Sequence, residues 1–430
     1  MRLVALLTLA LAAALTIETA SLAAAPQQET SGTVVPAGRM LEDRCCYSAT
    51  ALPDGRVLIV GGNDVTGGSL ERLATAEVWD PESLSFRPAG EMARPRAEHT
   101  AVLQPDGRVL VIGGTGPLAR TEDAELWDPA TDSFSAAPSM RHPRGHSATV
   151  AAFPDGRALV VGGVRQNEDN PGIVLKAEVW EPAKDAFEEA GELPRRPNRI
   201  EAFALEDGSA LLVQRPAREW LRWHPRKRRF DAVGRPDEPR DWVFPLANGR
   251  VLTTGAQRDR SKEDAELWLP RQKEFRPAGT FVIPRNTDSV TALPDGGALF
   301  YGGYDALLKD TTLFRTAEYW DPRSRSFSRA GRTAFGREWH TTTLLPDGRV
   351  AFIGGLLQRA PDRDSTVTDL IEVWDPASRS FSRAGRLLEP RALHRVVPLA
   401  DGSLLILGGG DANDELVSTA ELWTPPPPAG

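Results

Sequence analysis

The chain has 430 residues, and its 51 Lys or Arg and 59 Asp or Glu side chains give a net charge of −8. This negative balance does not favour a general nucleic-acid scaffold, so we expect no nucleic-acid partner. Glycine and proline number 38 and 35, and the only two cysteines are adjacent, so they cannot staple a long loop. The composition is that of one repeat domain.

Residues 1–25 have the layout of a secretory signal peptide. Arg2 is followed by an apolar run from Leu3 to Ile17 and by small residues at Ala23 to Ala25. We therefore expect an exported protein, located in the periplasm, at the cell surface or outside the cell. The apolar run of about 15 residues is shorter than the ~20 that a spanning helix needs, so we expect no transmembrane anchor. Residues 26–32 would form a short leader.

Residues 33–40 are predicted to form a strand whose partner lies at the other end of the chain. Their sequence, Thr-Val-Val-Pro-Ala-Gly-Arg-Met, resembles residues 85–92, which end a later repeat. The last repeat stops at Trp423 without a matching strand of its own. We predict that the N-terminal strand completes this last repeat and removes an open sheet edge. Residues 425–430 would be a Pro-rich tail.

One sequence pattern recurs eight times between the two ends. Each copy contains a Leu-Pro-Asp-Gly-Arg turn or a variant of it, mostly a Gly-Gly pair, and then a tryptophan segment such as Ala-Glu-Val-Trp-Asp-Pro, as in residues 52–81. The turn glycines are Gly55, Gly107, Gly156, Gly208, Gly249, Gly296, Gly348 and Gly402. Their spacings are 52, 49, 52, 41, 47, 52 and 54 residues. A period near 50 indicates a repeat of propeller type.

Each repeat is predicted to form four short antiparallel strands. In the second copy, residues 99–103 lead into an Asp-Gly hairpin turn, residues 108–112 form a strand buried on both faces, and Trp127 and Phe134 mark two further strands. Such sheets pack best against copies of themselves around an axis. We therefore predict a single all-β propeller over residues 33–424, with eight four-stranded blades. Seven remain an alternative, because the fourth repeat is short and degenerate.

The tryptophans of the eight repeats occupy one position and are predicted to pack between blades. They are Trp79, Trp127, Trp180, Trp223, Trp268, Trp320, Trp374 and Trp423.

The long, variable segments gather on one predicted face of the propeller. They follow the Gly-Gly pairs, at residues 63–74, 164–176, 304–316 and 356–369, whereas the opposite face has short, uniform turns. Variable loops on a rigid scaffold are the usual binding surface. We expect a protein, peptide or glycan partner there, bound by a monomer.

A recurring arginine followed three residues later by a polar residue precedes the first strand of several repeats. Convergent guanidinium and imidazole groups at the channel mouth could bind carboxylate, phosphate or sulfate groups. The alternative is structural, with each arginine bonding carbonyls or the repeated glutamate of the tryptophan segment. The candidates are Arg44 with Tyr47, Arg96 with His99, Arg285 with Asp288, Arg337 with His340, and Arg391 with His394.

From about Thr33 to Thr424 the chain resembles kelch-repeat propellers, and among them it is most similar to the galactose oxidase-like group. That resemblance implies the propeller fold. The group includes copper-radical oxidases, whose copper is held by two histidines and two tyrosines, with one tyrosine linked to a cysteine. Cys46 matches the position of that cysteine. The positions of the two tyrosines correspond to Glu98 and Trp339, so the radical chemistry is not implied.

The adjacent Cys45 and Cys46 leave three alternatives open. They could be buried small residues, a vicinal disulfide, or part of a copper or other metal site that would need His99, His340 or His394 nearby. No hydrolase, metalloprotease or phosphate-loop motif is present, and we assign no catalytic residue, metal ligand or cofactor.

The sequence as a whole favours a non-catalytic binding scaffold. The alternative is a galactose oxidase-like or sugar-acting enzyme at the channel mouth, with Arg337, His340 and His394 in its site and copper as its cofactor in the oxidase case.

Overall fold

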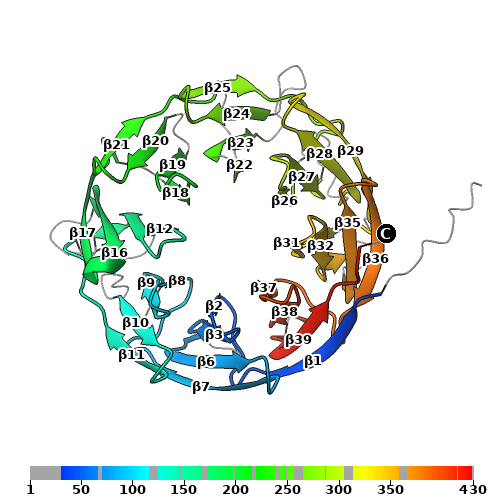
Figure 1. Cartoon of the computed structure of the whole chain (residues 1–430), viewed down its shortest axis with the longest axis horizontal. Coiled ribbons are helices and arrows are strands. Elements are labelled where there is room, and N and C mark those ends of the chain that lie inside the picture. The colour runs from blue at the N-terminus through cyan, green and yellow to red at the C-terminus, as the bar shows by residue number, and fades with distance from the viewer. Residues whose placement is uncertain are drawn as a thin grey trace, which may run out of the picture.

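The computed structural model describes residues 31–65, 70–115, 124–142, 144, 148–165, 172–196, 199–215, 219–237, 242–246, 249–255, 265–285, 287–304, 313–357, 366–413 and 415–428. The expected signal peptide at residues 1–25 lies outside the described residues. Within the described residues, no helix has both the length and the apolar character needed to cross a membrane. The predicted all-β class is confirmed, and the strands form sheets arranged in a ring (Figure 1).

The described residues contain eight four-stranded antiparallel sheets, each of which we call a blade. Blade 1 comprises β2 (Ser48–Ala51), β3 (Val57–Val60), β6 (Thr75–Asp80) and β7 (Ser85–Glu91), and blade 2 comprises β8 (Thr100–Leu103), β9 (Val109–Ile112), β10 (Glu125–Asp128) and β11 (Ser133–Ala136). Blade 3 comprises β12 (Ala148–Ala152), β13 (Ala158–Gly162), β16 (Lys176–Glu181) and β17 (Ala186–Glu192), and blade 4 comprises β18 (Arg199–Ala204), β19 (Ala210–Arg215), β20 (Trp220–His224) and β21 (Arg229–Ala232).

Blades 5 to 8 follow the same order from the channel outward, and the degenerate fourth repeat therefore forms a blade like the others. Blade 5 comprises β22 (Trp242–Pro245), β23 (Val251–Thr254), β24 (Ala265–Leu269) and β25 (Glu274–Pro277), and blade 6 comprises β26 (Ser289–Ala292), β27 (Ala298–Tyr301), β28 (Thr316–Asp321) and β29 (Ser326–Arg332). Blade 7 comprises β31 (Thr341–Leu344), β32 (Val350–Ile353), β35 (Leu370–Asp375) and β36 (Ser380–Arg386), and blade 8 comprises β37 (Arg395–Pro398), β38 (Leu404–Leu407), β39 (Thr419–Thr424) and β1 (Thr33–Arg39).

Blade 8 combines the two ends of the described chain. β1 pairs antiparallel with β39, and Val34 lies opposite Trp423. Figure 1 shows the blue first strand beside the red last strand on the outside of the ring. The strand order β1-β39-β38-β37 thus supplies the fourth strand that the last repeat lacks.

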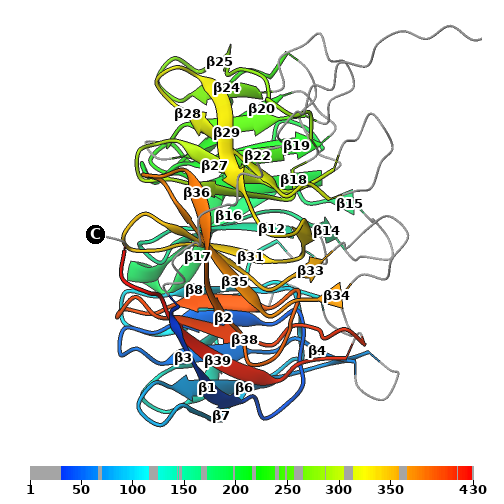
Figure 2. The same ribbon diagram turned by 90° about the vertical axis from the view of Figure 1, so that its right-hand side faces the viewer.

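Small additional strands extend from one face, which we call the loop face. They are β4 (Asn63–Asp64), β5 (Glu71–Arg72), β14 (Val164–Arg165), β15 (Gly172–Ile173), β30 (Arg337–Glu338), β33 (Leu356–Leu357) and β34 (Thr366–Val367). Figure 2 shows β4, β14, β15, β33 and β34 at the right-hand side of the ring. A 3-10 turn at Pro182–Lys184 (η2) lies in the tryptophan segment of blade 3.

Blades pack on each other through apolar side chains from their middle strands. Val78 of blade 1 and Val111 of blade 2 belong to one buried cluster with Trp127. The Nε1–H of Trp127 donates to the carbonyl of Ala89 in blade 1 at 2.9 Å. Seven of the eight repeat tryptophans donate this N–H to the preceding blade while their rings fill the space between blades, whereas Trp423 Nε1 is buried without a hydrogen-bond partner.

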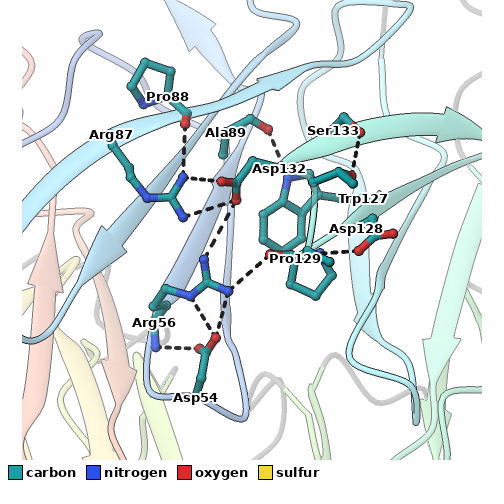
Figure 3. Close-up of polar contacts among 12 residues, drawn as sticks. Asp54, Arg56, Arg87, Pro88, Ala89, Trp127, Asp128, Pro129, Asp132 and Ser133 are labelled. Carbon is teal, nitrogen blue, oxygen red and sulfur yellow. Dashed lines mark hydrogen bonds and ion pairs between the residues drawn. The ribbon is translucent and has the colours of Figure 1, made fainter.

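The face opposite the loops joins neighbouring blades through charged side chains of the two repeated turns. Arg56, from the hairpin turn of blade 1, donates to Asp54 at 2.8 Å and lies 3.8 Å from Asp132 of blade 2. Arg87 donates to the same Asp132 carboxylate, and Figure 3 shows both guanidinium groups directed at it. The arginine of the hairpin turn in one blade therefore meets the aspartate that follows the tryptophan segment of the next blade, across the boundary between them.

Candidate functional site

The candidate arginines lie inside the blades, at the loop-face end. Arg44 has no exposed side-chain surface, and it donates to the carbonyls of Gly61 at 2.8 Å and Thr75 at 3.1 Å. It also forms a 2.7 Å ion pair with Glu77, the glutamate of the tryptophan segment. The Glu77 carboxylate further accepts the Leu41 N–H at 2.7 Å. We call this unit the clasp, because it joins the crossover from the previous blade to β6 and to the end of β3.

Among the described residues, the clasp recurs in blades 2, 3, 6, 7 and 8, and each of its arginines has at most 5% of its side chain exposed. The remaining pairs are Arg96 with Glu125, Arg144 with Glu178, Arg285 with Glu318, Arg337 with Glu372, and Arg391 with Glu421. Arg144 was not among the arginines selected from the sequence, although a polar residue, Ser147, follows it at the same spacing. This geometry is that of the structural alternative, in which a buried cation and carboxylate satisfy each other and nearby backbone groups.

The candidate histidines lie at blade boundaries and bond to the preceding blade. His99 Nε2 is 2.8 Å from Ser48 Oγ, and His394 Nε2 is 2.9 Å from Thr341 Oγ1. Burial lowers the pKa of His99 and of His394 to about 3, so both rings are neutral at pH 7. A neutral, hydrogen-bonded imidazole between two sheets acts as a packing group rather than as a free cation.

Tyr47 serves the boundary between blades 8 and 1. Its hydroxyl donates to the Leu407 carbonyl at 3.0 Å, and burial raises its pKa above the ordinary value. The Arg395 guanidinium lies 5.4 Å from the centre of its ring. The phenol is therefore enclosed between the first and last blades and does not reach the mouth.

In four blades an exposed residue lies two positions after the clasp arginine, at what we call the mouth position. Cys46, Glu98, Trp339 and Leu393 occupy it, with φ values of 59°, 56°, 56° and 55°, whereas Thr287, at the same position in blade 6, is buried. All four are exposed, Trp339 by 49% and Leu393 by 67%. Left-handed backbone at a residue other than glycine costs on the order of 1 kcal/mol and is concentrated at functional positions.

Main-chain hydrogen bonds link mouth positions of adjacent blades. The Leu393 N–H donates to the Trp339 carbonyl at 2.9 Å, and the Glu98 N–H donates to the Cys46 carbonyl at 2.9 Å. Blades 7 and 8 therefore display a tryptophan and a leucine side by side, and blades 1 and 2 a thiol and a carboxylate. Sequence reasoning missed Trp339 and Leu393 as candidate binding residues, because these four residue types share no chemistry that a pattern could reveal.

A second group of mouth residues lies at the boundary of blades 6 and 7. His340 is fully buried, with Nε2 3.0 Å from Ser289 Oγ and Nδ1 3.1 Å from Asp288 Oδ2, although the latter contact lacks hydrogen-bond geometry. Burial, followed by the charge of Asp288, raises the pKa of Glu338 above its ordinary value. The structure thus brings Asp288 and His340 together and adds Glu338 to them.

Both cysteines are free thiols. Cys45 is half-buried and Cys46 is exposed, and their Sγ atoms are 3.4 Å apart. Burial, together with the neighbouring Cys46 thiol, raises the pKa of Cys45 to about 11. The structure contains no bond between the two thiols, and the exposed Cys46 does not fit the alternative of two buried small residues.

The residues at the mouth do not fit the copper site that the galactose oxidase resemblance suggests. Glu98 and Trp339 are exposed where the resemblance would require tyrosines, and His340 Nε2 is occupied by Ser289. Among the described residues, no group of three or more His, Cys, Asp or Glu side chains could hold a metal ion. We therefore derive no step through copper.

The match to the Kelch motif and the likeness to one solved oxidase agree with this architecture. The Kelch motif model matches residues 44–93 and 96–141. A fungal alcohol oxidase of the AA5 family, solved in complex with copper, is 17% identical with a TM-score of 0.54, over 92% of this chain and 76% of the oxidase. The solved structure of YjhT is 14% identical with a TM-score of 0.40, over 76% of this chain and 94% of YjhT. No curated protein sequence matches the chain.

Proposed function

The chain carries Kelch motifs on a β-propeller, and on that premise we propose that it is an exported, non-catalytic binding protein that holds a protein, peptide or glycan at its channel mouth and loop face. The observation that carries the proposal is the pair of large apolar side chains at adjacent mouth positions, Trp339 and Leu393, exposed by 49% and 67%.

The backbone conformation of Trp339 and Leu393 supports a role for this pair in binding. Both residues are held in left-handed conformation, which glycine would adopt at lower cost. Exposed tryptophan is also among the residues that contribute most to binding when it is covered by a partner. The clasp arginines and boundary histidines form ion pairs and hydrogen bonds inside the fold. We therefore assign binding to the mouth positions and not to these arginines and histidines.

The test is capture of a partner by immobilised protein from the extracytoplasmic fraction of the source cells, with identification by mass spectrometry. The informative variant is Trp339→Ala with Leu393→Ala. The matched control is Leu344→Ala, which removes a side chain exposed by 38% at the opposite end of an inner strand. We expect the double variant, but not the control, to lose the partner that the wild type retains.

Retention of the same partner by the double variant would place binding elsewhere. If the wild type retains no macromolecule, the small-ligand or enzymatic alternative gains support, and copper uptake with peroxide production would then be the assay for an oxidase.

A further inference from the structure

Among the described residues, two acidic side chains, Asp288 and Glu338, are partly exposed at the mouth of blades 6 and 7. Asp288 has 24% of its side chain exposed, and Glu338 is half-buried one residue before Trp339. Arg337 is fully buried in its clasp with Glu372, so this cation does not neutralise them at the surface. The exposed Arg395 lies over Tyr47, at the boundary of blades 8 and 1. The mouth therefore has an acidic side next to an exposed indole.

A buried imidazole lies beneath this group. The His340 side chain is fully buried and its Nδ1 lies 3.1 Å from Asp288 Oδ2, without the geometry of a hydrogen bond, which Nδ1 of His99 and of His394 lacks as well. The Asp288 carboxylate therefore rests against the imidazole and still has 24% of its side chain exposed. The Phe352 ring stacks on the imidazole at 5.7 Å and holds it in place.

We propose that Trp339, Asp288 and Glu338 bind an organic cation, an ammonium or guanidinium group carried by a peptide side chain or a small molecule. This inference rests on the proposed binding function and names its ligand class. The indole face attracts a cation within about 6 Å, and carboxylates supply charge-assisted hydrogen bonds to its N–H groups. Among the residues that the structure describes, no cluster offers three side chains that could ligate a metal ion.

The charge of this ligand is opposite in sign to the charge suggested by the sequence. Arginine and histidine at the repeated spacing suggested a site for anions. In the structure those groups are buried, and carboxylates with an indole occupy the accessible positions.

Calorimetric titration with benzyltrimethylammonium and with Nα-acetyl-arginine amide tests the proposal, with benzoate as the anionic control. We expect saturable binding of at least one cation and none of benzoate. Trp339→Ala and the isosteric double variant Asp288→Asn with Glu338→Gln should each weaken cation binding by about tenfold or more. A pentapeptide with a central arginine distinguishes the sources, since it should bind more tightly than the amide if the natural ligand is a peptide.

Two matched controls separate the site from global effects. Leu388→Ala removes a side chain exposed by 55% from the crossover into blade 8, and Glu82→Gln removes one negative charge from the turn face. Both should bind the cations as the wild type does. Absence of saturable cation binding, equal binding of benzoate, or unchanged affinity in the Asp288/Glu338 variant would overturn the inference. If the Asp288/Glu338 variant still captures the macromolecular partner and the Trp339/Leu393 variant does not, the proposed binding function is supported and the proposed cation ligand is not.

Discussion

Trp180 donates its Nε1–H to the side-chain oxygen of Gln104 at 2.9 Å, where Trp127 and most of its equivalents donate to a main-chain carbonyl of the preceding blade. The difference has a cause in the sequence. Pro138 stands in blade 2 where Gly90 stands in blade 1 with a φ of 83°, a value that proline cannot adopt. The outer strand β11 ends at Ala136, and Gln104, in the position of Leu52, supplies the missing acceptor.

Gln104→Leu restores the residue of the other repeats, yet we expect it to destabilise the protein. It leaves the buried Trp180 N–H without a partner, which costs about 1–3 kcal/mol of unfolding free energy. Urea denaturation measures the loss. The same substitution in a Trp180→Phe background should cost less, because no indole donor remains; equal costs in both backgrounds would contradict the compensation.

Arg44→Ala should be among the most damaging single substitutions. It leaves the Glu77 carboxylate, of which 2% is exposed, buried without its cation. Removing one partner of a buried ion pair costs about 3–5 kcal/mol. A thermal melt of Arg44→Met with Glu77→Gln should recover part of this loss, whereas a shift within error for Arg44→Ala would show that the clasp is dispensable.

Stability should fall as the pH drops below about 6.5, the ordinary pKa of histidine. Burial lowers the folded-state pKa of His99 and His394 to about 3, so between these values the unfolded chain binds more protons than the folded one. Each histidine then contributes a loss of about 1.4 kcal/mol per pH unit. His99→Gln should flatten the profile between pH 6 and 4, and Ser48→Ala, which keeps the imidazole, should not.

Thiol labelling should distinguish the two cysteines. Cys46 is exposed, whereas Cys45 has a pKa of about 11 against an ordinary 9.0 and so carries about one hundredth of the usual thiolate fraction at pH 8. We expect iodoacetamide to modify Cys46 first, and Cys46→Ser to leave one slowly reacting thiol by mass spectrometry. Rapid labelling of Cys45, or a mass 2 Da below that of the dithiol, would contradict the free, half-buried thiol.

The sequence predicted the fold well because a repeat multiplies weak signals. One Leu-Pro-Asp-Gly turn is an ordinary hairpin, but eight copies of this turn or its variants, each followed by a tryptophan 15 to 26 residues after the turn glycine, indicate a propeller. The kelch resemblance and the all-β class are confirmed by the Kelch motif match at residues 44–93 and 96–141 and by the four-stranded sheets.

The mouth was harder to predict, for a physical reason. The spacing from Arg337 to His340 is the same whether the side chains face the channel or the blade interior, and only the partners Glu372 and Ser289 settle it. The left-handed backbone of Trp339 leaves no sequence signature, since glycine is absent. In contrast, Pro138 and Gln104 were both visible as departures from the repeat, and comparing blades position by position would have paired them.

The pairing of β1 with β39 also affects the order in which blades can form during synthesis of the chain. During synthesis β1 emerges first and its partner last, so blade 8 cannot assemble until nearly the whole chain has been released. The other blades use strands that are neighbours in sequence and can form as they appear. Contacts between residues so distant in sequence close slowly. In a newly made chain, β1 therefore stays without its partner strand until β39 has been made.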